Sequence, residues 1–238
     1  FVLGIDGAPP KYILNEWVDE LPNLKKLLKN SIYGELESTI PPSTIIAWTS
    51  MLTGKDPSHF DVYSYTYKDK DNKTKLTDSF CVKEKRIWKY LDENNKRSIL
   101  LHVPLTYPVE PVNGMMLGGF LTPGLNEKSY FPNKLKKEVL KVSSDYKFDV
   151  GVGLAGYKDI ESDRMIKEVH EMTNKQLTLT KNLMKTEKWD FFMTVLIGSD
   201  RIQHTMWRFH DKEHRRYPGR NKYEDSLKEY YQSIDMSI

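Results

Sequence analysis

The sequence predicts an α/β protein, a three-layer sandwich in which helices cover both faces of a mostly parallel sheet. Short continuous apolar runs alternate along the chain with segments whose apolar residues recur every three or four positions. The first pattern is typical of strands buried on both faces, and the second is typical of covering helices. Because sheets of this kind bind ligands outside the carboxyl ends of their strands, polar residues that follow apolar runs are the first candidates for a functional site.

The chain begins with the order strand, helix, strand. The apolar run 1–5 ends at Asp6, which therefore lies at the carboxyl end of a predicted strand. Leucines at helical spacing predict a covering helix over 21–30. Residues 33–37 are predicted to form a second short strand that leads into the next helix. Asp6 is thus the first acidic residue that this pattern places at the edge of the sheet.

A helix is predicted from Thr44 to Gly54, directly after Pro41 and Pro42. Proline favours extended geometry before it and fits only the first turn of a helix, so the helix should begin near Ser43 or Thr44. Gly54 should end it. The start of a helix has unpaired N–H groups and the positive end of the helix dipole, which suits a phosphate beside the Thr44 hydroxyl. Thr44 is therefore a candidate nucleophile, and the alternative is an ordinary capped core helix.

The middle of the chain completes the predicted sheet. The polar, tyrosine-rich stretch 55–79 is expected to form a loop or small hairpin. A helix over 85–94 leads into a central strand over 97–103, which Pro104 ends. The same criteria predict the remaining elements: an apolar run over 115–120, helices over 133–142, 161–187 and 222–238, and a strand over 189–197. Residues 146–157 fit none of these patterns.

A second acidic residue follows the strand predicted over 189–197. Asp200 lies just after this strand, and His204 lies four positions further on, so the two share one face of a helix and can bind one ion. A carboxylate with an imidazole suits zinc or manganese. The alternative is a helix N-cap followed by a solvated histidine. We expect Asp6, Thr44 and Asp200 to converge at the carboxyl ends of the strands.

The other histidines give weaker signals. His210 and His214 have the same spacing and form a rival metal half-site, although their polar surroundings favour a solvated turn. His59, His102 and His170 have no partner that the sequence reveals, so we assign them to structure.

Composition limits the class of protein. Of the 238 residues, 39% are hydrophobic, and 36 basic against 33 acidic residues give a net charge of +3, so charge implies no nucleic-acid partner. The single cysteine, Cys81, excludes an intrachain disulfide framework and favours a reducing compartment, so we expect a cytoplasmic protein. No apolar run approaches the ~20 residues of a membrane span, so no membrane partner is expected. Because Phe1 already lies inside a predicted strand, the sequence leaves open an upstream leader.

No repeat or linker divides the sequence. We therefore expect one domain over 1–238, with an excursion at 63–83 or a small insertion within 124–160.

Four segments occur in a characteristic order: LGIDG at 3–7, STIPPST at 38–44 with its continuation to 54, PLTYP at 104–108 and DRIQHTMW at 200–207. Together they resemble the type I phosphodiesterase/nucleotide pyrophosphatase family of the alkaline phosphatase superfamily. The resemblance implies an alkaline phosphatase-like fold and metal-dependent hydrolysis of phosphodiester or nucleotide pyrophosphate bonds (EC 3.1.4 or 3.6.1). The implied substrate is a small phosphate ester or a nucleotide.

The resemblance also implies a site. Two divalent ions, usually zinc with manganese as an alternative, would be bound by Asp6 and Thr44 and by Asp200 and His204. Thr44 would be the nucleophile that becomes covalently modified. One departure is Ala47, where members that process nucleotides often have asparagine. The alternative functions are phosphomonoester hydrolysis or phosphoryl transfer on the same scaffold, and a non-catalytic metal- or phosphate-binding fragment.

The end of the chain bears on the number of metal ligands. The family completes its site with an Asp-His pair and a further histidine downstream, whereas this chain stops at Ile238. Two zinc ions need about six ligands, and four candidates are too few. The helix predicted over 222–238 has an apolar face and no stop signal after it. We therefore expect the chain to be C-terminally incomplete. The sequence predicts no oligomeric state.

Overall fold

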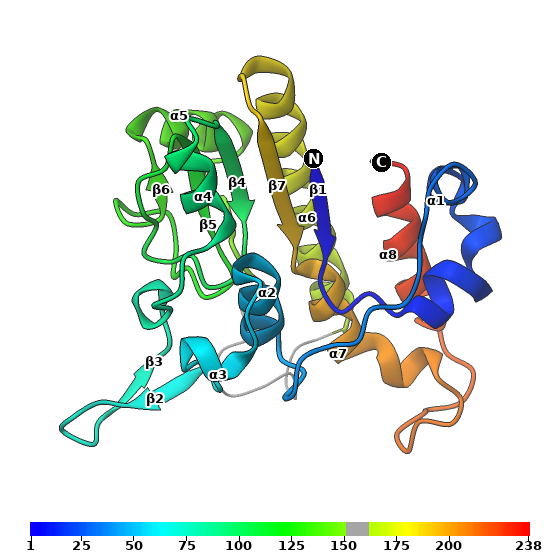
Figure 1. The fold of residues 1–238 in the computed structure, drawn as a ribbon. Helices are drawn as coiled ribbons and strands as arrows, with labels where there is room; N and C mark the ends of the chain where they lie inside the picture. The colour runs from blue at the N-terminus through cyan, green and yellow to red at the C-terminus, as the bar shows by residue number, and fades with distance from the viewer. Residues whose placement is uncertain (151–161) are drawn as a thin grey trace. The chain divides into compact units, whose positions relative to one another are not determined.

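The computed structural model describes residues 1–150 and 162–238 (Figure 1). These residues form two compact units. The first unit comprises Phe1–Gly4, Glu37–Asp149 and Lys175–Leu196, and the second comprises Ile5–Leu36, Ile197–Ile238 and the described part of Val150–Asn174. A single domain with a small insertion within 124–160 stays a prediction. Residues 151–161, which overlap that stretch and the unassigned segment 146–157, lie outside the described residues.

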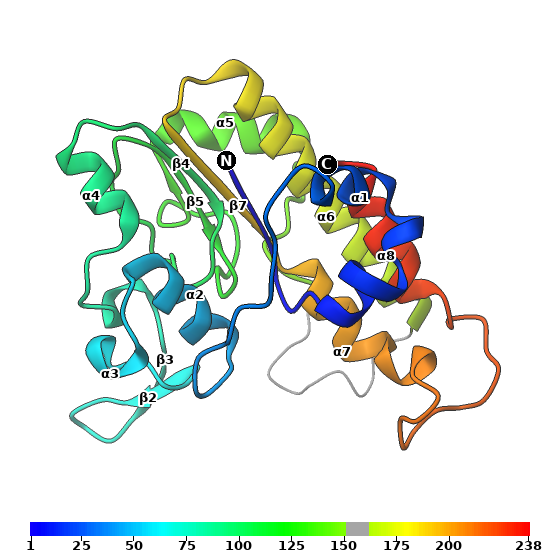
Figure 2. The ribbon, with the colours of Figure 1, turned by 45° about the vertical axis from the view of Figure 1, so that its right-hand side comes forward.

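The first unit contains a five-stranded sheet with the order β1-β7-β4-β5-β6. Its strands are β1 (Val2–Ile5), β4 (Ser98–His102), β5 (Gly114–Gly119), β6 (Tyr130–Phe131) and β7 (Phe191–Leu196). Strand β4 pairs in parallel with β5 and with β7, and the short β6 is antiparallel to its neighbour β5. Strands β4, β5 and β7 lie side by side in Figures 1 and 2. The predicted α/β fold with a mostly parallel sheet is confirmed.

The central strands have apolar side chains on both faces, and helices therefore cover both faces of the sheet. One face packs against α5 (Asn133–Val142) and the C-terminal part of α6 (Ser162–Thr186), and the other against α2 (Thr44–Thr53) and α4 (Ile87–Glu93). The first face buries Ile99, Leu101, Met115, Leu117 and Phe192 with Leu135, Val139, Leu179 and Leu183. The second buries Leu100, Met116, Met193 and Val195 with Leu52 and Trp88. Burial of this kind contributes about 1.5–3 kcal/mol for each large apolar side chain.

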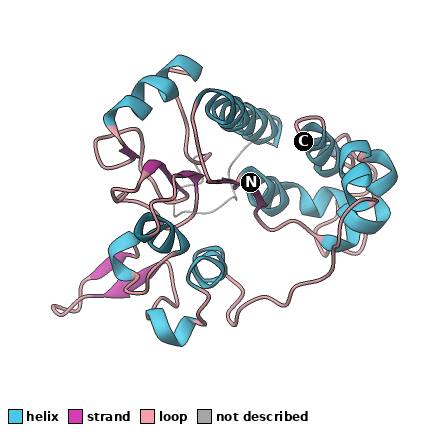
Figure 3. Ribbon diagram, turned by 45° about the horizontal axis from the view of Figure 1, so that its top comes forward, coloured by secondary structure: helices cyan, strands magenta, loops and turns pink. Residues whose placement is uncertain are grey.

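Helix α2 begins and ends where the sequence predicts. It starts at Thr44, after Ser43 in an extended conformation, and Gly54 follows it with a left-handed φ of 67°. The stretch after α2 contains the short helix α3 (Pro57–Phe60), the antiparallel hairpin of β2 (Thr66–Lys68) and β3 (Thr74–Leu76), and the 3₁₀ turn η3 (Ser79–Cys81). The hairpin is a separate pair of magenta strands in Figure 3. The predicted loop or hairpin is confirmed.

The second unit is helical. It contains the π-helical turn η1 (Lys11–Glu16), the 3₁₀ turn η2 (Val18–Glu20), α1 (Pro22–Leu28), the N-terminal part of α6, α7 (Gly198–His210) and α8 (Ser226–Asp235). Helices α7 and α8 pack together, and α8 also contacts α1. None of the helices in the described part of the chain has the length and apolarity that crossing a bilayer requires.

One predicted strand is wrong. Residues 33–37 form no strand, and no described strand pairs with them. They are exposed, and an ideal Cβ built on Gly34 meets no atom within 4 Å. A strand requires a neighbour for its backbone N–H and C=O groups, so an apolar pattern without such a neighbour remains a loop. The sequence patterns also missed β6, because two residues are too few for a recognisable period.

Candidate active site

The turn after β1 brings Asp6 against helix α7. Asp6 is 7% exposed, and Gly7 has a φ of 65°, a conformation that favours glycine. A Cβ at Gly7 would lie 3.4 Å from the Nε2 atom of Gln203 and 3.7 Å from the Cα atom of Asp200. The Asp6-Gly7 turn therefore lies directly against the first two turns of α7.

Asp200 and His204 form an ion pair on one face of α7. The Nε2 atom of His204 lies 3.3 Å from Oδ1 of Asp200, and the other carboxylate oxygen lies 3.2 Å from the guanidinium of Arg201. The hydrogen bond to Asp200 is the main cause that raises the pKa of His204, and the charges of Asp200 and Asp6 add to it. Burial and Arg201 act in the opposite direction. The spacing of four residues thus brings an imidazole and a carboxylate to one point.

An open pocket of about 350 Å³ lies at this face, lined by Gly7, Asp200, Gln203, His204 and Trp207. The helical positions 200, 203, 204 and 207 share one face because they are three or four residues apart. Sequence reasoning did not assign a role to Gln203 or Trp207, although that same spacing, counted on from Asp200, points to both. The pocket brings the carboxylate of Asp200 and the imidazole of His204 together. Such a pair can bind a cation or transfer a proton.

Three of the four candidate residues belong to the second unit. Asp6, Asp200 and His204 lie there, and the field of Asp6 acts on His204. Thr44 is the first residue of α2, is half-buried and belongs to the first unit. Its convergence with the other three stays a prediction.

The donor set fits a divalent ion in chemistry. Carboxylate oxygen and imidazole nitrogen are ligands that zinc and manganese accept, and the Asp200–His204 contact shows that the two donors reach the same point. Within residues 1–150 and 162–238, no group of three or more His, Cys, Asp or Glu side chains is arranged to hold a metal ion. A metal site that includes Asp200 and His204 therefore stays a prediction.

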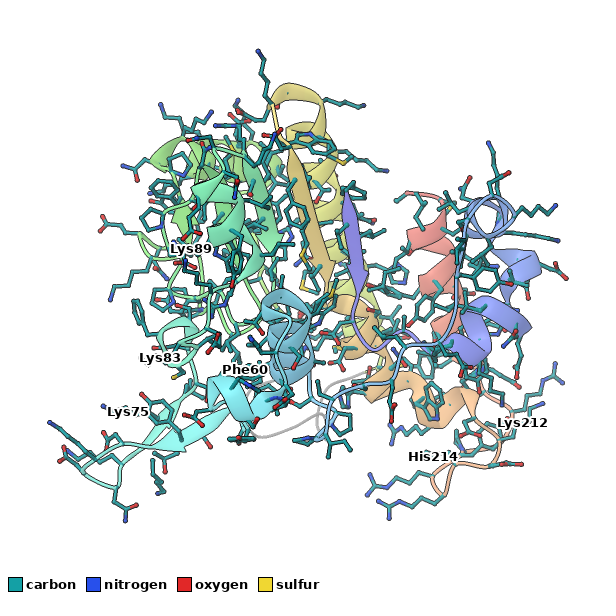
Figure 4. The ribbon with its side chains drawn as sticks, in the orientation of Figure 1. Phe60, Lys75, Lys83, Lys89, Lys212 and His214 are labelled. Atoms are coloured by element: carbon teal, nitrogen blue, oxygen red, sulfur yellow. The ribbon has the colours of Figure 1, made fainter. Side chains whose placement is uncertain are left out.

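The rival pair His210 and His214 does not share a helical face. Helix α7 ends at His210, whose ring packs edge-on against the rings of Tyr12 and Trp17. His214 lies in the turn beyond the helix (Figure 4), and its Nδ1 atom accepts a hydrogen bond from the backbone N–H of Arg216. The interpretation of this segment as a turn is confirmed.

A mostly parallel sheet, with Asp6 directly after β1 and Asp200 in the first turn of the helix that follows the neighbouring strand β7, defines an α/β protein of the class that binds ligands at strand ends. The fold is similar to two crystal structures of phosphonoacetate hydrolase from Sinorhizobium meliloti 1021, in complex with phosphonoacetate and with phosphonoformate. Both have a TM-score of 0.53, with 13% and 12% sequence identity over 99% of this chain. At this identity the likeness shows the fold alone. The chain spans about half, 52%, of the length of these structures.

The family follows from the sequence as a whole. The model of the type I phosphodiesterase/nucleotide pyrophosphatase family matches residues 1–238, and the chain belongs to this family. The resemblance seen in the four sequence segments is thereby confirmed. Among curated proteins, none matches the chain.

Proposed function

We propose that the protein hydrolyses phosphodiester or nucleotide pyrophosphate bonds, with Thr44 as a covalent nucleophile. The observation that carries the proposal is the pocket in which the Asp200–His204 pair lies beside the Asp6-Gly7 turn, in a member of a phosphodiesterase family. In the first displacement, the Thr44 oxygen would bond to phosphorus while the leaving oxygen departs. In the second, a water would displace Thr44 and release the phosphate product.

The start of α2 supports this role of Thr44. Among the described residues, the side chain of Ser43 makes no capping hydrogen bond to the helix. The N–H of Ile46 already donates to the carbonyl oxygen of Ser43 at 3.0 Å, so it is the N–H of Thr44, at the start of the helix, that would hold an equatorial oxygen of a phosphoryl group beside the Thr44 hydroxyl. This use of a helix start requires a phosphate-bearing substrate, in agreement with the family.

The donor residues would contribute ligands to two divalent ions, zinc or alternatively manganese: Asp6 and Thr44 to one ion, and Asp200 and His204 to the other. When bound, such ions supply Lewis acidity that lowers the pKa of a coordinated hydroxyl and offsets charge on phosphoryl oxygens. The chain's own contribution is orientation: Arg201 holds one oxygen of Asp200, which leaves the other directed at His204. The single cysteine, Cys81, supports a reducing compartment such as the cytoplasm.

We expect substrates to be small diesters or nucleotides, with diester activity above monoester activity. The first unit has three exposed tyrosines at Tyr63, Tyr65 and Tyr67, which suit an aromatic or nucleoside group. Hydrolysis of bis-nitrophenyl phosphate and of nitrophenyl phosphate, compared with zinc and with manganese, tests this preference. A clear monoester preference would favour a phosphomonoesterase or phosphotransferase, and metal or phosphate binding without turnover would favour a non-catalytic module.

Replacement of Thr44 by alanine in the intact protein tests the nucleophile. We expect hydrolysis to fall by more than ~10³-fold, the scale for loss of a covalent nucleophile, while the fold is retained. The matched control is Thr53→Ala, which removes a threonine hydroxyl from the other end of α2, where it bonds the carbonyl of Thr49 at 2.8 Å. A Thr44→Ala variant that keeps more than a tenth of the wild-type turnover would contradict the assignment.

A further inference from the structure

Gln203 connects three parts of the second unit through one side-chain amide. Its Nε2 atom lies 2.8 Å from the carbonyl oxygen of Gly7, 2.9 Å from that of Ser199 and 3.1 Å from the hydroxyl oxygen of Tyr231. The amide has two N–H groups, so these oxygens share its donors. Gln203 lies on α7 between Asp200 and His204, so it is itself part of the proposed site.

The bond to Gly7 helps to hold the turn that carries Asp6. The hydroxyl of Ser199 donates to the backbone carbonyl of Asp6 at 2.6 Å, and Gln203 donates to the next carbonyl, that of Gly7. Both donors are side chains of α7, the helix that carries Asp200. The turn is therefore fixed to the same rigid element as the other donors, and two consecutive carbonyl groups are satisfied at once.

Tyr231 supports Gln203 from the far side. It lies on α8, is 3% exposed and contacts the ring of Trp17 at 5.9 Å and that of Tyr230 at 5.9 Å. These contacts restrain the ring whose hydroxyl meets Gln203. The amide of Gln203 is thus held between the carbonyl of Gly7 and the hydroxyl of Tyr231. These two contacts restrain the Asp6-Gly7 turn from shifting along α7.

We propose that Gln203 is a positioning residue that sets the spacing between Asp6 and the Asp200–His204 pair, and thereby the affinity of the site for a divalent cation. This role rests on the proposed function in one respect, that Asp6, Asp200 and His204 are metal ligands. Its test is cation binding, which does not depend on catalytic turnover. Outer-shell partners of metal ligands typically change affinity by 10- to 100-fold when they are replaced. Without the N–H groups of Gln203, the turn would lose an anchor to α7, and the position of Asp6 relative to Asp200 and His204 would be less restrained.

The test is cation binding by residues 1–238, with two variants of Gln203. Gln203→Met keeps the length of the side chain and removes the donors, while Gln203→Asn keeps an amide that is too short to reach all three oxygens. Zinc affinity is measured by isothermal titration calorimetry, and the visible absorption of bound cobalt reports ligand geometry. The matched control is Gln232→Met on α8, whose amide lies 3.4 Å from an exposed carboxylate oxygen of Glu20.

We expect both Gln203 variants to bind zinc 10- to 100-fold more weakly and to change the cobalt spectrum, at an unfolding midpoint close to that of the wild type. Gln232→Met should leave affinity and spectrum unchanged. A folded Gln203 variant with wild-type zinc affinity and cobalt spectrum would overturn the positioning role alone. A wild-type chain that binds no zinc would overturn both this role and the proposed metal site.

Discussion

His102 is a buried histidine with an unusual backbone conformation. It ends β4 with a φ of 59°, and its Nε2 atom lies 2.7 Å from the hydroxyl of Tyr146. Its Nδ1 atom lies 3.4 Å from Oγ1 of Thr194 on β7. The side chain is 1% exposed, and burial lowers its pKa to about 3. The imidazole is therefore neutral at pH 7, and its structural assignment is consistent with these contacts.

This histidine makes the stability of the protein depend on pH. The unfolded chain binds the proton near pH 6.5, whereas the folded chain binds it only near pH 3. The contribution of His102 is complete above pH 6.5, and it is lost as pH falls toward 3, by about 1.4 kcal/mol per pH unit. His102→Asn removes the titration, and asparagine tolerates a positive φ. Urea unfolding between pH 7 and 4 should give a steeper loss for the wild type. Equal slopes in both proteins would contradict this prediction.

At the scale of elements, Asp235 of α8 caps the N-terminus of α1, although the two helices are distant in sequence. The carboxylate of Asp235 accepts the backbone N–H groups of Asn23 at 3.1 Å and of Leu24 at 2.7 Å. Leu21, the residue before α1, provides no side-chain cap among the described residues. Asp235 thus accepts hydrogen bonds from two of the N–H groups that a helix start leaves unpaired. It is buried, with 2% of its surface exposed.

The Asp235→Asn variant should therefore destabilise the second unit. An amide keeps one acceptor oxygen, and its NH2 group would face the second backbone N–H, so we expect the free energy of unfolding to fall by about 1–3 kcal/mol. Thermal and urea unfolding measure the change. As a control, Asp225→Asn alters an exposed residue at the start of α8 that pairs with Lys228 at 3.4 Å. Its effect should stay below about 0.5 kcal/mol. Comparable losses in the two variants would show that the cap is unimportant.

At the scale of the whole molecule, the number of donors limits the number of ions. The candidate metal ligands are Asp6, Thr44, Asp200 and His204. Two tetrahedral ions need about six ligands. We expect residues 1–238 to bind fewer than two equivalents of zinc after removal of metal with a chelator and reloading. Mass spectrometry of metal content checks the number. Two tightly bound equivalents would require further donors, such as His210 or His214, in the site.

Local patterns in the sequence determined much of this protein. The bounds of α2 follow from Pro42 and Gly54, because proline and glycine restrict or permit particular backbone angles wherever they occur. The central strands follow from continuous apolar runs, and the Asp200–His204 pair follows from the period of a helix. These features depend on residues only a few positions apart, so a single sequence is enough to predict them.

The tertiary structure decided the rest, because it sets which distant groups meet. The segment 33–37 has the composition of a short strand, yet it has no neighbour among the described strands and remains an exposed loop. Gln203 meets Gly7 across 196 positions, and Asp235 meets Asn23 across 212. Backbone carbonyl and N–H groups are the same at every residue, so no sequence pattern marks which of them a distant side chain will bind. Only the packing of α7 and α8 against the start of the chain selects those partners.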